Sequence, residues 1–236
     1  SLPPISAHKQ PHLISRQKKK GISTVTEALA AVAAGEALPN NTLDLSNQAS
    51  FQINPDKKVS EMCDAMQSRT KGNSSLDALM DDGEEGSGNG MKVVKLKGCC
   101  IGDRGASLIA GAISAGTFKT VTELDLSDNV IKEDGCVCIA RALARNRHLK
   151  ILNLMGMPRL GQNEKVLRAF VEMYSTNFTL LKIVWRLDHP LANSLAQFTT
   201  RNNTFAGRQR RARASQDSVL NRIKPASSGS GASALD

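Results

Sequence analysis

Residues 123–135 read ELDLSDNVIKEDG, and CVCIARALARN follows at residues 136–146. Leu124 and Leu126 alternate with polar residues, which is the two-residue period of a strand with one buried face. Asn129 follows where a turning backbone needs its polar groups satisfied by a side chain. After Gly135, apolar and small residues recur at helical spacing. The two stretches therefore predict a unit of strand, turn and helix, about thirty residues long.

The same unit occurs thirty residues earlier, so the chain contains an internal repeat. The matched pairs at this offset are Val94–Leu124, Leu96–Leu126, Cys99–Asn129, Ile101–Ile131, Gly105–Gly135, Ile109–Ile139, Ala110–Ala140, Ala112–Ala142 and Ile113–Leu143. Looser units begin at Leu43, Leu152 and Ile183, which makes about five in all. We expect an α/β solenoid with parallel strands at 43–46, 94–97, 124–127, 152–155 and 183–186. Three repeats are enough to bury a continuous core.

The pattern L-x-L-x-x-N-x-I-x-x-x-G, followed by I/L-A-x-A-L, resembles the ribonuclease-inhibitor class of leucine-rich repeat. The resemblance implies a right-handed solenoid with strands on the concave face and helices on the convex face. It also makes Cys99 a ladder residue, because such repeats alternate Asn with Cys at that position. Trp185 falls on a buried strand position and is expected in the core.

The closing repeats resemble those of tropomodulins and leiomodins. The resemblance rests on a Leu-Gly-x-Asn loop at 160–163, an Asn-x-Thr-Leu-Leu-Lys element at 177–182, the RNN of residues 201–203 and an arginine cluster at 208–213. It implies a cytoskeletal role, with actin as the best-named partner.

The ends of the chain differ from its middle in charge. The net charge is +9, of which residues 1–24 carry +5 and residues 201–236 carry +5, leaving the body at −1. We expect a basic disordered tail over 1–23, a capping helix within 24–40, and the repeat domain over 41–203. An acidic, glycine-rich insertion is expected at 70–90, and an Arg-rich then Ser/Gly-rich disordered tail at 204–236.

The residue types favour a binding protein over an enzyme. The sequence holds no Gly-x-Ser-x-Gly elbow, no phosphate-binding loop ending in Gly-Lys-Ser/Thr and no His-Glu-x-x-His. We therefore expect no catalytic residues, no cofactor, no metal and no small-molecule substrate. No apolar run approaches the ~18 residues that a membrane span needs.

Five cysteines, an odd number, and no secretory leader near the start predict reduced thiols in a cytoplasmic, cytoskeleton-associated protein. The Asn-x-Thr triplets at Asn40, Asn177 and Asn202 are then coincidental, because glycosylation requires secretion. Cys136 and Cys138 start a helix, but no histidine lies near them in the sequence to activate a thiol.

A protein partner is expected on the strand residues that alternate with the buried leucines. Met155 and Val184 are apolar although the register points them to solvent, which is typical of an interface core. The predicted partner-binding residues are Asn153, Met155, Val184, Arg186, Lys95 and Lys97 on the strands, with Arg208, Arg210, Arg211 and Arg213 in the adjoining segment.

Two other functions stay open from the sequence. The basic tails are consistent with an RNA- or ribosome-associated protein, although no aromatic residues lie among the arginines for base stacking. Similar repeat blocks also occur in ciliary or axonemal scaffolds. The leading interpretation is a non-enzymatic, tropomodulin-like scaffold that binds actin filaments or caps their pointed ends.

Overall fold

The computed structural model describes residues 24–73, 90–157, 160–186 and 188–223. Its strands form one parallel sheet, in which the strand order follows the chain. The strands are β1 (Thr42–Asp44), β2 (Val93–Lys95), β3 (Glu123–Asp125), β4 (Ile151–Asn153) and β5 (Lys182–Val184). Each strand pairs in parallel with the next, as the solenoid predicts.

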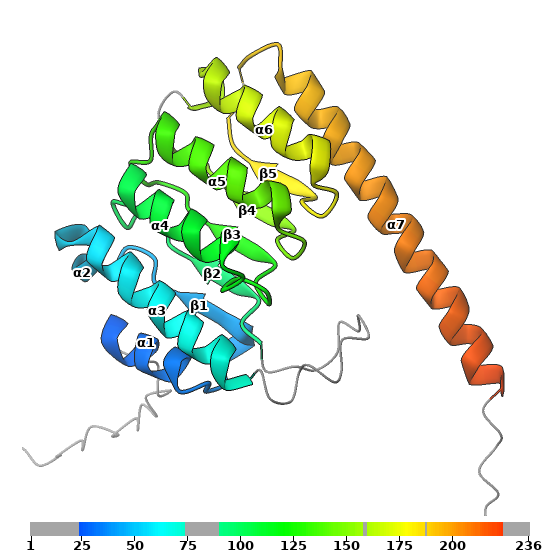
Figure 1. Cartoon of the computed structure of the whole chain (residues 1–236), viewed down its shortest axis with the longest axis horizontal. Helices are drawn as coiled ribbons and strands as arrows, with labels where there is room; N and C mark the ends of the chain where they lie inside the picture. The colour runs from blue at the N-terminus through cyan, green and yellow to red at the C-terminus, as the bar shows by residue number, and fades with distance from the viewer. Residues whose placement is uncertain (1–23, 74–89, 158–159, 187, 224–236) are drawn as a thin grey trace, which may run out of the picture.

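A layer of helices covers one face of the sheet. Figure 1 shows α3, α4, α5 and α6 side by side, with α1 at one end of the row and α7 at the other. The helices are α1 (Val25–Ala33), α2 (Ala49–Ile53), α3 (Pro55–Asn73), α4 (Asp103–Ser114), α5 (Glu133–Arg145), α6 (Glu164–Thr176) and α7 (Ala192–Ile223). Short 3-10 turns occupy Pro39–Asn41 and Leu160–Gln162.

The core consists of aliphatic ladders that run across the strands. The first ladder is Leu43, Val94, Leu124 and Leu152, which are at most 2% exposed. The next buried position gives a second ladder, Leu45, Leu96, Leu126 and Leu154, with the same low exposure. Full burial of one such side chain contributes about 2 kcal/mol, so each position of the two ladders stabilises the stack of repeats.

A glycine in each of two repeats lets neighbouring helices meet at their N-terminal ends. A Cβ on Gly135 would lie 2.7 Å from Asp103 Oδ1 and 2.9 Å from the Cβ of Ala106. The same Asp103 oxygen accepts hydrogen bonds from the backbone N–H groups of Lys132 (2.8 Å) and Gly135 (3.0 Å). This close approach explains the Gly105–Gly135 repeat seen in the sequence.

A buried asparagine closes the turn between strand and helix. The side chain of Asn129 accepts hydrogen bonds from the backbone N–H groups of Cys99 and Ile101, each at 3.0 Å. Its Nδ2 donates to the carbonyls of Leu96 and Leu126, each at 2.8 Å. Cys99 is fully buried and its Sγ donates to the Leu45 carbonyl, so its prediction as a ladder residue is confirmed.

The C-terminal segment differs from the prediction. The composition of residues 204–223 predicts disorder, but these residues continue α7, so the expected domain end at 203 lies inside a helix. The prediction is wrong because it rests on composition alone. The first part of α7 docks on α6, while arginine, alanine and glutamine are good helix formers that allow the helix to continue.

Other boundaries shift by smaller amounts. Strands begin one residue earlier than expected and are shorter, because inter-strand pairing starts before the first leucine. Residues 70–73 of the expected insertion belong to α3, and 74–89 lie outside the described residues. Residues 1–23 and 224–236 also lie outside them. Trp185 is half-buried and packs edge-on against Phe170, with ring centroids 4.9 Å apart.

Candidate partner-binding site

The sheet surface is the face of the sheet that the helices leave open. Side chains alternate along a strand, so the residues between the buried leucines point to this face. Its central row, from β1 to β5, is Asp44, Lys95, Asp125, Asn153 and Val184. A second row lies two residues later on each chain segment and consists of Ser46, Lys97, Ser127, Met155 and Arg186.

Carboxylates neutralise both lysines of the sheet surface. Lys95 Nζ lies 3.8 Å from Asp44 Oδ2, and Lys97 Nζ lies 3.3 Å from Asp128 Oδ2. These groups are about half exposed, so each pair contributes little to stability, about 0–1 kcal/mol. The predicted residues Lys95 and Lys97 therefore present matched charge pairs rather than a positive patch.

Apolar side chains reach the sheet surface at its β4–β5 end. Asn153 and Val184 are paired in register, and Asn153 Oδ1 accepts a hydrogen bond of 3.1 Å from the Met155 N–H. Met155 is 44% exposed and Val184 is half-buried. Arg186 is exposed and its Nε lies 3.4 Å from Asp188 Oδ2. The structure thus gathers four of the predicted residues at one end of the sheet.

A third row of the sheet surface was missed by the sequence interpretation. Val93 pairs with Glu123, Glu123 pairs with Ile151, and all three side chains are partly exposed. They share the open face because they lie two residues before the central row. The predicted strands begin one residue too late to include them, although the alternating pattern extends back to these positions.

The predicted arginines Arg208, Arg210, Arg211 and Arg213 lie on α7 rather than on the sheet. Their side chains are exposed. Figure 1 shows this half of α7 projecting past the repeats. The predicted site is therefore divided between the β4–β5 end of the sheet surface and a projecting basic helix.

An aromatic cluster at the base of the projecting helix was also missed. The Arg201 guanidinium lies 4.1 Å from the ring centroid of Phe178 and 5.0 Å from that of Phe198. The rings of Phe178 and Phe205 lie 6.2 Å apart and are 44% and 47% exposed. Cation–π contacts of this kind hold an arginine against an apolar surface. The sequence carries no signal for the cluster, because Phe178 meets α7 only in the folded chain.

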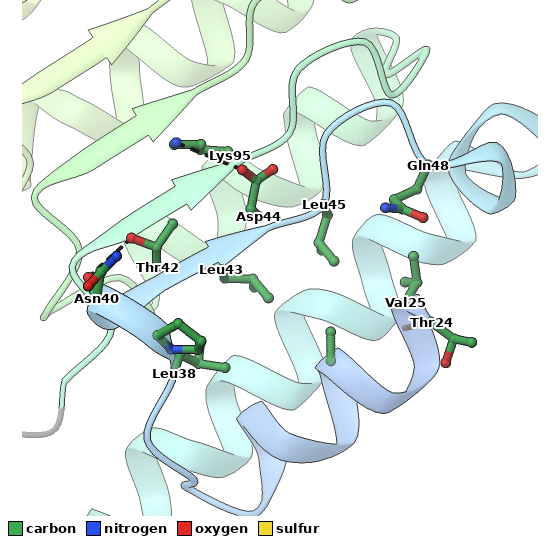
Figure 2. Close-up of a pocket in the computed structure, with 12 residues that line it drawn as sticks. Thr24, Val25, Leu38, Asn40, Thr42, Leu43, Asp44, Leu45, Gln48 and Lys95 are labelled. Carbon is green, nitrogen blue, oxygen red and sulfur yellow. Dashed lines mark hydrogen bonds and ion pairs between the residues drawn. The ribbon is translucent and has the colours of Figure 1, made fainter. Parts of the chain in front are cut away.

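A cavity of about 370 Å³ lies at the opposite end of the sheet, between α1 and β1 (Figure 2). Thr24 and Val25 line it from one side, and Leu43 and Leu45 line it from the strand. Asp44 and Lys95 are the only ionisable side chains among its described lining residues, and they form an ion pair. Polar and apolar side chains line this cavity in similar measure, and it lies beside the β1 edge of the sheet.

The two buried thiols of the repeats, Cys99 and Cys136, are poorly suited to nucleophilic chemistry. Burial raises the pKa of Cys99 to about 11 and the pKa of Cys136 to about 12. All five cysteines are free thiols. In the described ranges, no cluster of three or more His, Cys, Asp or Glu side chains could hold a metal ion. Every described helix is also too short or too polar to cross a lipid bilayer.

Comparison with known proteins supports the repeat assignment. Residues 91–110 and 119–140 match the family model described as Leucine Rich repeat. No curated protein matches the sequence. The domain of leiomodin-1 named Actin-Binding Site 2 superimposes with a TM-score of 0.64 at 20% identity, over 83% of this chain and 98% of that one. The tropomodulin C-terminal domain of Caenorhabditis elegans gives 0.59 at 10% identity, over 80% of this chain and 99% of that one.

At these identities the likeness is one of fold. It extends over nearly the whole length of both solved domains. Together with the parallel sheet, the buried leucine ladders and the matched repeat segments, it identifies this chain as a leucine-rich-repeat solenoid with the fold of the tropomodulin and leiomodin C-terminal domains.

Proposed function

We propose that this chain is a non-enzymatic protein-interaction scaffold of the cytoskeleton and that it binds actin filaments. The observation that supports this most is an open parallel sheet with apolar residues at its β4–β5 end, in a fold shared with a domain named for actin binding. A broad array of parallel strands is a typical recognition surface of repeat proteins. Buried leucines hold the strands rigidly, so the surface is preorganised.

The proposed contact is the β4–β5 end of the sheet surface. Met155 and Val184 supply apolar area, and Asn153 and Arg186 surround them with polar groups. An apolar centre with a polar rim is the usual anatomy of an interface. The exposed arginines of α7 add positive charge suited to an acidic partner surface, which mainly accelerates association.

Co-sedimentation of the full chain with filamentous actin tests the proposal. We expect the wild-type chain to sediment with filaments and the double variant Met155→Ser/Val184→Ser to bind more weakly by about 1–3 kcal/mol. Its free energy of unfolding should fall by no more than about 1 kcal/mol, because Met155 is exposed and Val184 is only half-buried. Ile53→Ser is the matched control, since Ile53 is also apolar and is 86% exposed, and it ends α2 in the first repeat, at the other end of the strand order from β4 and β5.

The outcomes separate the alternatives. Absence of the wild-type chain from the pellet would reject actin filaments as the partner. Normal binding by the double variant would place the site elsewhere on the solenoid. Elongation of labelled actin from pointed ends then distinguishes capping from binding along the filament. If the partner is RNA held by the basic tails, affinity falls steeply with salt and is lost on deletion of 1–24 and 207–236.

A further inference from the structure

A groove of about 550 Å³ runs between α4 and α5 on the helical side of the molecule. These helices lie side by side in Figure 1, on the opposite side of the sheet from the sheet surface. Ser107, Gly111 and Ser114 line the groove from α4, and Arg141 and Arg145 line it from α5. The groove is therefore separate from the site proposed for actin.

The two arginines of this groove lack partners inside the fold. Among the described residues, neither Arg141 nor Arg145 forms an ion pair or a side-chain hydrogen bond. They are four residues apart on one helix, so their Cβ atoms are about 6 Å apart and two like charges share one face, at a cost of a few tenths of a kcal/mol. By contrast, Arg168 on the neighbouring α6 lies 2.6 Å from Glu164, one turn away.

Helix electrostatics explain only one of these arginines. Arg145 lies in the last turn of α5, where a cation is favoured by the helix dipole. Arg141 lies one turn earlier, beyond the range of that effect. The folded chain therefore gains little from Arg141, and an acidic group in the groove would relieve the repulsion between the two guanidinium groups.

Packing within the chain does not explain why a glycine, Gly111, lines this groove. A Cβ on Gly111 would meet no atom within 4 Å, so no neighbour requires glycine there. Glycine inside a helix costs about 1 kcal/mol relative to alanine. The hydroxyls of Ser107 and Ser114 also have no hydrogen-bond partner among the described residues, whereas Ser68 and Ser175 donate to backbone carbonyls of their own helices.

We propose that this groove binds an acidic segment of a protein partner. Arg141 and Arg145 would contact its carboxylates, Ser107 and Ser114 would donate hydrogen bonds, and Gly111 would admit its backbone. Acidic residues four apart on a helical segment have the same Cβ spacing as Arg141 and Arg145, about 6 Å. Arginine suits this role because its guanidinium donates two parallel hydrogen bonds to one carboxylate.

Protection of Cys138 from alkylation tests the proposal locally. Cys138 lines the groove and is partly exposed, whereas Cys100 is exposed and lies on a turn after β2. The full chain is treated with N-ethylmaleimide, with and without a hexaglutamate peptide, and each cysteine is followed by peptide-mapping mass spectrometry. We expect the peptide to slow labelling of Cys138 at least about threefold, roughly the effect of saturating a site to two thirds. Cys100 labelling should not change, so acidic peptide bound to the basic tails does not mimic the result.

Variants distinguish a peptide that binds inside the groove from one that is held only by the positive charge around it. Arg141→Gln/Arg145→Gln should abolish the protection of Cys138. Gly111→Leu keeps every charge but fills the groove, and it should abolish the protection as well. Arg168→Gln on α6 is the matched control and should leave the protection intact, because Arg168 lies outside the groove and is paired with Glu164.

Three results would overturn the proposal. The first is equal labelling of Cys138 with and without hexaglutamate in the wild-type chain. The second is full protection in the Gly111→Leu variant, which would show that the peptide is held by charge without entering the groove. The third is stronger protection by hexauridylate than by hexaglutamate, which would make the ligand a nucleic acid.

Discussion

Asn177 shows how a single side chain joins three repeats. It is fully buried between α6 and β5, and its Nδ2 donates to the carbonyls of Leu143 (2.6 Å) and Asn146 (3.0 Å). Its Oδ1 accepts hydrogen bonds from the backbone N–H groups of Thr179 and Leu180. Asn202, on α7, repeats the arrangement by donating to the carbonyls of Asn177 and Leu180.

Replacing Asn177 by alanine should lower the free energy of unfolding by roughly 3 kcal/mol, because several buried backbone groups would lose their partners. Urea unfolding followed by circular dichroism measures the change. Asn193→Ala is the control, since Asn193 is exposed at the start of α7, and it should stay within about 0.5 kcal/mol of wild type. A loss below about 1 kcal/mol in Asn177→Ala would mean that water replaces the amide.

The sequence predicts the structural role of some individual residues but not of others. Asn129 and Cys99 can be assigned to a ladder because they recur at the repeat offset. The Asn-x-Thr triplets of Asn177 and Asn202 give no indication of the structural role of these side chains. Their partners lie in neighbouring repeats, and hydrogen bonds between distant segments leave no local pattern in a sequence.

At the scale of elements, periodicity predicts the regular parts well. Alternating leucines place the start of each strand within one residue and its end within two, and the helical spacing of α4 and α5 is equally clear. α7 was missed beyond residue 203 because its second half has no apolar stripe. Its first half is different, since Leu195, Phe198 and Asn202 are buried or partly buried against the last repeat.

Truncations should separate the two halves of α7. Removal of residues 207–236 should leave the melting temperature within about 2 °C of wild type, because the residues described from 208 to 216 are exposed. Removal of residues 199–236 should lower it by more than about 5 °C, because the last repeat loses the hydrogen bonds of Arg201 and Asn202. Thermal unfolding followed by circular dichroism provides the measurement.

Equal effects of the two truncations would contradict this division. Equally large losses would show that the projecting half of α7 stabilises the repeats, and equally small losses would show that Arg201 and Asn202 contribute little to stability. A large drop in the melting temperature on removal of residues 207–236 would likewise show that the arginine-bearing half of α7 stabilises the repeats.

At the scale of the whole molecule, the candidate site follows from the solenoid only in part. The thirty-residue register is sufficient to place Lys95, Asn153 and Val184 on one face of the sheet. Register does not determine side-chain conformations, so it could not predict the neutralisation of Lys95 by Asp44. Nor does it show how the ends of the stack are covered, and the aromatic cluster of Phe178, Arg201 and Phe205 belongs to such an end.

Buried thiols couple the stability of successive repeats to pH. Burial raises the pKa of Cys63 on α3 and of Cys136 on α5 to about 12, and that of Cys99 in the turn after β2 to about 11. Neighbouring carboxylates, Asp64 for Cys63 and Asp103 for Cys136, act in the same direction. An unfolded chain has thiols with a pKa of about 8.5.

These shifts predict a loss of stability in alkali. Between about pH 9 and pH 11 the unfolded state binds fewer protons than the folded state, so the free energy of unfolding falls as the pH rises. Each thiol contributes a slope of up to about 1.4 kcal/mol per pH unit in this window, and none at pH 7. Urea unfolding at pH 7.5, 9.0 and 10.5 measures the slope. Cys136→Ala should reduce this slope by the contribution of one thiol, whatever the variant costs at pH 7.5. A wild-type slope that survives in Cys136→Ala would show that other groups, such as lysines, cause the alkaline unfolding.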